Sequence, residues 1–136
     1  MAGREKVLRP GWALRLFPAV LVTVAVFLLG TATPAHAPRL DFHWGDKVGH
    51  FFAFGFVQIT YARSAGFLWP ELCTRKLAWR AACASALLGL LLEVVQGFLP
   101  YRSAEFADFV ADGVGAVFAS VLYIYLSRWQ TRYERD

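Results

Sequence analysis

Long runs of apolar residues, separated by short polar connections, dominate the chain. Four such runs can be marked, at residues 12–30, 48–69, 78–99 and 106–127. A helix that crosses a membrane needs about 20 mostly apolar residues, and the first, third and fourth runs satisfy this. The pattern predicts an all-α integral membrane protein, a four-helix bundle formed by a single domain over residues 1–136.

The second run is the least regular, because Arg63 interrupts it and leaves residues 48–62, a short stretch, as its uninterrupted part. Either the long side chain of Arg63 reaches the membrane interface, or the helix is short and tilted neighbours cover the difference. Trp69 and Pro70 close the run, since proline ends a helix and tryptophan favours the interface. We predict a transmembrane helix here as well.

The N-terminus also fits a cleaved signal peptide, with basic residues before residue 10, an apolar stretch at residues 16–30 and an A-x-A site at residues 35–37. The apolar stretch is long for a signal peptide, and Pro38 directly after the cut would hinder a peptidase. We favour an uncleaved first helix.

Composition agrees with a membrane protein. Hydrophobic residues make up 57% of the chain and charged residues 18%, against roughly 45–50% and about 25% in soluble domains. The basic residues flank the apolar runs, so the net charge of +4 indicates no nucleic-acid partner. Cys73 and Cys83 lack the spacing of a disulfide framework or a zinc site, and we interpret both as ordinary apolar residues.

The basic residues also predict an orientation. Lys and Arg in short loops favour the cytoplasmic side. One side of the four predicted helices would carry only three of them, and the other side would carry the remaining eleven. The three are Arg39, Lys47 and Arg102. The N-terminus, the middle connection and the C-terminus are therefore predicted to be cytoplasmic.

Polar residues gather in three places that this topology puts at one depth, near the outer ends of the second, third and fourth helices. The clusters are Asp46, Lys47 and His50; Glu93, Gln96 and Arg102; and Glu105, Asp108 and Asp112. Ionisable residues are costly inside a bilayer and usually have a partner or a function there. We therefore predict a shared polar site. Its expected members are Asp46, Lys47, His50, Glu93, Gln96, Arg102, Asp108 and Asp112.

Each member also has a structural interpretation. Asp46 and Glu105 suit the positive end of a helix dipole, and His50 would donate to a neighbouring carboxylate. Glu93 is the clearest functional candidate, since it lies well inside its helix. His36 and His43 have no partner at useful spacing, and we interpret them as solvated.

Small residues on the fourth helix indicate which side faces its neighbours. Ala107, Ala111, Gly115 and Ala119 recur at every fourth position, and the adjacent ridge carries Asp108, Asp112, Ala116 and Ser120. Because small residues let helices approach closely in lipid, the carboxylates are predicted to point into the bundle.

At these positions the sequence resembles the VanZ-like family, small membrane proteins named for a teicoplanin-resistance accessory protein. The family pattern is D-K-x-x-H-F, then E-x-x-Q with a following P-x-R, then D-x-x-x-N-x-x-G. Here these are DKVGHF from Asp46, EVVQGFLPYR from Glu93 and DFVADGVG from Asp108. Asp112 departs from the family asparagine, which adds a carboxylate. The resemblance implies a bacterial inner-membrane protein of the cell envelope and gives no reaction.

Three functions fit these residues. The first is binding or sensing of an envelope lipid or lipophilic glycopeptide, with Lys47, His50 and Arg102 holding an anionic group and the carboxylates a polar or cationic one. The second is an intramembrane lipid-modifying enzyme, in which His50 and Glu93 act as base and partner or His50 and the carboxylates hold a divalent metal. The third, a proton path, is least favoured because the inner half is apolar. No cofactor is expected under the first function, membrane lipids are the expected partners, and the sequence gives no oligomeric state.

Overall fold

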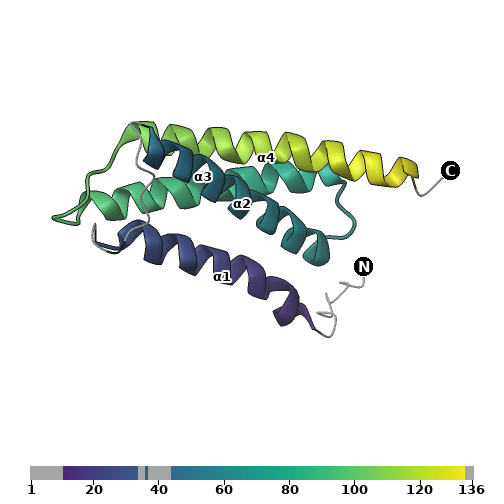
Figure 1. Cartoon of the computed structure of the whole chain (residues 1–136). Helices are drawn as coiled ribbons and strands as arrows, with labels where there is room; N and C mark the ends of the chain where they lie inside the picture. Colours follow the sequence, from purple (N-terminus) through teal and green to yellow (C-terminus); the bar gives the residue numbers. More distant parts are fainter. Residues whose placement is uncertain (1–10, 34–35, 37–43, 134–136) are drawn as a thin grey trace, which may run out of the picture.

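The computed structural model describes residues 11–33, 36 and 44–133. These residues form the helices α1 Trp12–Thr31, α2 Gly45–Leu68, α3 Thr74–Gly97 and α4 Phe106–Tyr133 (Figure 1). All regular elements within the described ranges are α-helices, as predicted. The basic residues before Gly11, most of the predicted peptidase site and His43 lie outside these ranges.

The helix bounds differ from the predicted runs where polar residues extend a helix beyond its apolar part. Helix α2 begins three residues earlier than residue 48 and thereby includes Asp46 and Lys47. Helix α3 begins at Thr74 rather than residue 78, and α4 continues to Tyr133 rather than residue 127. A hydropathy pattern marks only the apolar part of a helix, whereas backbone hydrogen bonding continues into its polar ends.

Within the part of the chain that the structure describes, three helices are long and apolar enough to cross a membrane. These segments are Ala13–Thr31, Thr74–Gly97 and Phe106–Gln130. Helix α2 carries Asp46, Lys47 and Arg63 and is not among them. The membrane character of the chain therefore rests on α1, α3 and α4, and the fourth spanning helix stays a prediction.

Helices α2, α3 and α4 pack against one another, and α1 lies against α2 and α3. Figure 1 shows that α1 ends, α2 begins, α3 ends and α4 begins at the same end of the molecule. The most deeply buried apolar side chains include Phe54 and Val57 of α2 and Leu92 of α3. The topology thus brings four helix ends together, two from the first half of the chain and two from the second half.

The predicted inward face of α4 is confirmed for the ridge that carries the carboxylates, whereas Ala107 on the adjacent ridge is exposed. Asp108, Asp112, Ala116 and Ser120 are all buried. On the opposite side, bulky residues are exposed, and they include Val117, Phe118 and Val121. Small residues allow α2 to approach this face closely, since a Cβ added at Gly55 would lie 3.4 Å from the carbonyl oxygen of Gly115.

Midway along the helices, buried polar side chains bond to backbone carbonyls of neighbouring helices. Ser85 donates to the carbonyl of Phe54 at 3.1 Å, and Gln58 and Ser120 both donate to the carbonyl of Ala78, at 3.3 and 3.2 Å. Hydrogen bonds between helices are one of the main interactions that hold apolar helices together in lipid. These side chains therefore link α2, α3 and α4.

Candidate functional site

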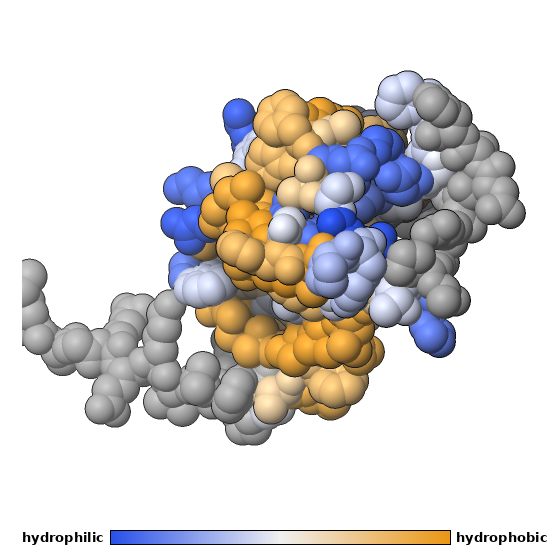
Figure 2. All heavy atoms as spheres, turned by 90° about the vertical axis from the view of Figure 1, so that its left-hand side faces the viewer, coloured by the Kyte–Doolittle hydropathy of each residue, from blue (hydrophilic) through white to orange (hydrophobic). Residues whose placement is uncertain are grey.

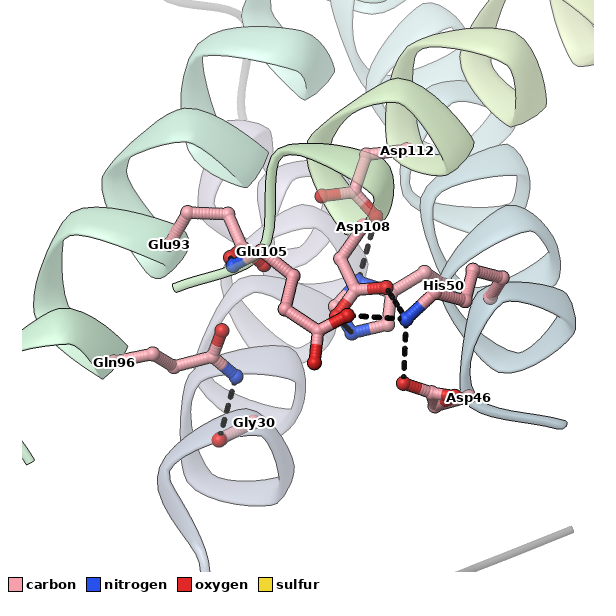
Figure 3. Close-up of polar contacts among 9 residues, drawn as sticks. Gly30, Asp46, His50, Glu93, Gln96, Glu105, Asp108 and Asp112 are labelled. Carbon is pink, nitrogen blue, oxygen red and sulfur yellow. Dashed lines mark hydrogen bonds and ion pairs between the residues drawn. The ribbon is translucent and has the colours of Figure 1, made fainter. Parts of the chain in front are cut away.

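Seven charged or ionisable side chains meet where α2 begins, α3 ends and α4 begins. We call them the polar cluster (Figure 3). Its members are Asp46, Lys47, His50, Glu93, Glu105, Asp108 and Asp112. Figure 2 looks onto this end of the molecule, where hydrophilic side chains gather among hydrophobic ones. The cluster has two parts, one around Lys47 and one around His50.

The lysine-centred group consists of Lys47 and three carboxylates. Nζ of Lys47 lies 3.0 Å from Oδ2 of Asp46, 2.6 Å from Oε2 of Glu105 and 2.9 Å from Oδ1 of Asp108. Lys47 precedes the apolar part of α2, and its hydrogen bonds to Glu105 and then Asp108 raise the pKa of the ammonium above its usual range. The ammonium therefore stays charged and occupies the centre of this group.

Exposure differs sharply among these carboxylates. The side chain of Asp108 is only 9% exposed, whereas those of Asp46 and Glu105 are 58% and 47% exposed. Helix α4 begins directly after Glu105, so its first turn presents Asp108 inward and leaves Glu105 at the rim. The two exposed carboxylates give this end of the molecule an acidic rim.

The histidine-centred group lies deeper and consists of His50, Glu93 and Asp112. Nδ1 of His50 lies 2.8 Å from Oδ1 of Asp112, which orients the imidazole ring. Oε2 of Glu93 accepts the backbone N–H of Glu105 at 2.8 Å. Nε2 of His50 lies 3.9 Å from Oδ2 of Asp108, which is the link between the two groups.

Two carboxylate oxygens of the histidine-centred group have no hydrogen-bond partner among the described residues. They are Oε1 of Glu93 and Oδ2 of Asp112, and both are buried. The backbone of α3 leaves space for Asp112 only because residue 89 is glycine, since a Cβ there would lie 2.5 Å from Oδ2 of Asp112. The site therefore holds buried acceptors that can take a proton donor or a cation.

Gln96 and Arg102, which the sequence places in the shared site, point to α1 instead. Nε2 of Gln96 donates to the carbonyl of Gly30 at 2.9 Å (Figure 3). Nη2 and Nε of Arg102 donate to the carbonyl of Ala32 at 2.9 and 3.2 Å. The last carbonyls of a helix lack partners within the helix, so these two side chains satisfy the end of α1.

Two contributors at this end were not included in the predicted site. Glu105 belongs to the third polar cluster of the sequence but not to the predicted site, and it contacts Lys47 through its side chain and Glu93 through its backbone N–H. Tyr101 donates to the carbonyl of Thr31 at 3.1 Å and adds a fourth hydrogen bond to the end of α1. The position of Glu105, three residues before Asp108, is the sequence signal that could have identified it.

Comparisons with known proteins assign the chain to a family. A family model described as VanZ/LLP1 matches residues 7–127. An uncharacterized protein of the fission yeast Schizosaccharomyces pombe is 33% identical over 107 residues, which cover 77% of this chain and 62% of the relative. This chain therefore spans less than two thirds of the length of that relative.

No solved structure matches the chain. The family match covers all three motifs on which the resemblance rests, from Asp46 to Gly115. It also covers the four helices apart from the end of α4. The chain belongs to the VanZ/LLP1 family.

Proposed function

We propose that the chain is a four-span membrane protein that binds or senses a membrane lipid or similar amphiphile whose head group carries an amine. Both ends would lie in the cytoplasm, and the polar cluster would lie at the head groups of the outer leaflet. The observation that carries this proposal is the acidic rim at one end of a set of apolar helices. The head group of a lipid would meet the acidic rim, and its acyl chains would meet the apolar helices directly beside the rim.

The charges of the cluster favour an amine over a phosphate as the group that contacts the rim. Five carboxylates accompany one ammonium and one imidazole. Lys47 already contacts three carboxylates, and Arg102 is engaged with α1. Neither basic side chain is then available to an anionic head group, whereas Asp46 and Glu105 are exposed and negative.

Apolar side chains beside the rim would receive the acyl chains. Phe52 is 68% exposed, Phe98 84% and Phe106 79%, and they belong to the same ends of α2, α3 and α4. Exposed large apolar side chains next to a polar site are typical of surfaces that meet lipid or another partner. The combination suits an amphiphile better than a small soluble ligand.

The narrower ligands that the resemblance implies, a bacterial envelope lipid or a lipophilic glycopeptide such as teicoplanin, remain members of this class. Placement in the bacterial inner membrane is likewise part of the proposal. The relative from fission yeast favours the broader class, because a membrane lipid is available in both kinds of cell.

The test compares phosphatidylethanolamine with phosphatidylglycerol of identical acyl chains, using native mass spectrometry of the purified protein. The proposal expects preferential retention of the amine lipid. The double variant Asp46→Asn, Glu105→Gln should lose this preference, whereas Glu71→Gln, an exposed acid in the α2–α3 connection, should keep it. Equal retention of both lipids by the wild type would contradict the proposal.

A lipid-modifying enzyme is the second candidate, favoured by the hydrogen bond between His50 and Asp112. A carboxylate that fixes the orientation of an imidazole is a common arrangement for a general base. Proteoliposomes would show lipid turnover by mass spectrometry that disappears in His50→Gln. Unchanged lipid composition with the wild-type protein would argue against an enzyme acting on the lipids supplied.

A further inference from the structure

The histidine-centred group gathers three different metal-ligating side chains from three helices. His50 of α2, Glu93 of α3 and Asp112 of α4 each offer one ligand atom, and these atoms all lie within 4.8 Å of one another. The carboxylates are almost fully buried, with Glu93 5% and Asp112 0% exposed. Ligands bound to zinc lie about 2.0–2.2 Å from the ion, so the side chains would need to close by roughly an ångström.

The unpartnered oxygens show that this group is incomplete. Oε1 of Glu93 and Oδ2 of Asp112 are buried and accept no hydrogen bond among the described residues. A buried carboxylate without a compensating partner is strongly unfavourable, and buried charges are usually paired or coordinate a metal. In the lysine-centred group, Oδ1 of Asp108 also lacks a hydrogen bond among the described residues, but there the ammonium of Lys47 lies 2.9 Å away and supplies the positive charge.

The second set of acids at this end, Asp46, Glu105 and Asp108, also lies within ligand distance of one another. Lys47 contacts all three, so its ammonium holds the position that a cation would take. In the histidine-centred group the one basic side chain is His50, and its Nδ1 is engaged with Asp112 alone. The two groups therefore differ in whether an ammonium already lies among the carboxylates, and this difference decides whether an added ion is needed.

We propose that His50, Glu93 and Asp112 form a binding site for one divalent transition-metal ion of the Zn²⁺ or Mn²⁺ class. One imidazole nitrogen and two carboxylate oxygens match the ligand preference of these ions. Mg²⁺ and Ca²⁺ prefer oxygen ligands alone, so the imidazole selects against them. The ligands come from three helices, and the ion would therefore also link α2, α3 and α4.

Asp112 stands where the family pattern given above has asparagine, so the pattern itself would supply one carboxylate fewer. The aspartate adds a second carboxylate to the one from Glu93, and Gly89 provides the space for it. This proposal is independent of lipid binding at the rim, which rests on Asp46 and Glu105. Either can fail while the other holds, since the two sets of residues are separate.

The test uses the full chain, purified in detergent with a tag that contains no histidine. After treatment with a chelator and its removal, the protein is titrated with Zn²⁺ or Mn²⁺, and bound metal is measured by elemental mass spectrometry after gel filtration. We expect one ion per chain and a rise in the thermal unfolding midpoint, because binding to the folded state stabilises it. Excess Mg²⁺ or Ca²⁺ should not displace the ion.

Matched variants locate the ion. Loss of a side chain that only supports a metal ligand typically weakens metal binding by about 10–100-fold. Glu93→Gln and Asp112→Asn remove a ligand itself, so each should raise the dissociation constant of the ion by at least this factor. Glu105→Gln and Asp46→Asn make the same chemical changes in the lysine-centred group and should leave it unchanged. Gly89→Ala removes no ligand but displaces Oδ2 of Asp112, so it should weaken binding even if a ligand variant fails to fold.

Several outcomes would overturn the proposal. The first is a wild-type protein that binds no ion at stoichiometric level. The second is binding by Glu93→Gln and Asp112→Asn that is as tight as binding by the wild type. The third is an equal loss of affinity in all four carboxylate variants. A wild-type titration that finds no bound ion decides against the proposal without any variant. Lipid retention by the same samples, measured separately, distinguishes failure of the metal site from failure of the rim.

Discussion

Nζ of Lys47 lies 2.9 Å from Oδ1 of Asp108, across 61 positions of the chain and between the first turns of α2 and α4. The lysine side chain is 20% exposed, and the aspartate side chain is 9% exposed. The two carboxylates that Lys47 also contacts are much more exposed. The contact with Asp108 is therefore the most deeply buried ion pair of Lys47, and it fixes the relative position of the two helix ends.

Replacing Lys47 by methionine should destabilise the protein. Asp108 would keep a buried carboxylate without its cation, which costs about 1–3 kcal/mol for an unsatisfied buried group, and more where it is charged. Thermal or denaturant unfolding of the purified protein in detergent would measure the loss. Glu105→Gln removes an exposed partner, and the loss should be about 0–1 kcal/mol, as for surface ion pairs.

The double variant Lys47→Met, Asp108→Asn provides the check. Removing both charges should recover part of the stability lost in Lys47→Met, because no buried charge is left unpaired. The losses of stability in the single variants Lys47→Met and Asp108→Asn are measured as well. If these two losses simply add in the double variant, the ion pair does not carry the stabilisation. Lys47 would then act through its aliphatic stem or through Asp46 and Glu105.

A second prediction concerns Arg102 and Gln96, which bond to the end of α1. Arg102→Ala and Gln96→Ala should each lower stability by about 1 kcal/mol, as expected for one hydrogen-bonded side chain. Hydrogen exchange should also become faster around residues 28–33, because the carbonyls of Gly30 and Ala32 lose their partners. Arg75→Ala, at an exposed position at the start of α3, is the matched control.

The same variants decide between two roles. If Arg102 holds an anionic ligand, as the sequence suggests, Arg102→Ala should abolish ligand retention while hydrogen exchange in α1 stays unchanged. If it anchors α1, exchange should increase while Zn²⁺ or Mn²⁺ binding at His50 persists. Loss of ligand with an unchanged α1 would return Arg102 to the ligand site.

The sequence predicts the helices well because their apolar runs are long and separated by charged connections. Burial of Asp108, Asp112, Ala116 and Ser120 also follows from spacing alone, since small and polar residues recur at helical intervals. Even the meeting of Glu93 with the α2 and α4 residues could be predicted, because topology puts three helix ends at one level.

The pairing within the site could not be predicted in this way. Lys47 and Arg102 are both basic residues at one end, yet one turns to carboxylates and the other to carbonyls of α1. Side-chain direction and the packing of α1 decide between these partners, and neither is visible in spacing. The last carbonyls of α1 need hydrogen-bond donors from outside the helix. A hydropathy pattern does not reveal this, because it does not record unpaired backbone groups.

A third prediction compares two glycines of α4. A Cβ at Gly115 would collide with the backbone carbonyl of Phe51 in α2, whereas a Cβ at Gly113 would meet nothing within 4 Å. Gly115→Ala should therefore destabilise the protein by about 1–3 kcal/mol through overpacking. Gly113→Ala should be neutral or stabilise by about 0.5–1 kcal/mol, because alanine is the better helix former.

Unfolding in detergent would measure both glycine variants under the same conditions. The comparison isolates close packing of α2 and α4 from helix propensity, since both substitutions add one methyl group to the same helix. Equal effects at the two positions would mean that α2 and α4 can separate at little cost. The close approach near Phe51 would then not contribute to stability.

The last prediction concerns orientation, which Cys73 makes accessible to a direct test. Cys73 is exposed in the connection between α2 and α3, and Cys83 is exposed on α3. With both ends of the chain in the cytoplasm, that connection is cytoplasmic too. In a Cys83→Ala background, a membrane-impermeant maleimide should label Cys73 only after the cells are permeabilised.

The complementary variant replaces Cys73 by serine and places a cysteine at Ser103, which is exposed between α3 and α4. It should be labelled in intact cells, because the proposed orientation puts this connection and the adjoining polar cluster on the outer side. The reverse pattern would put the acidic rim in the cytoplasm, where its lipid would come from the inner leaflet. Labelling of both sites in intact cells would mean that α3 does not cross the membrane, contrary to its length and apolar composition.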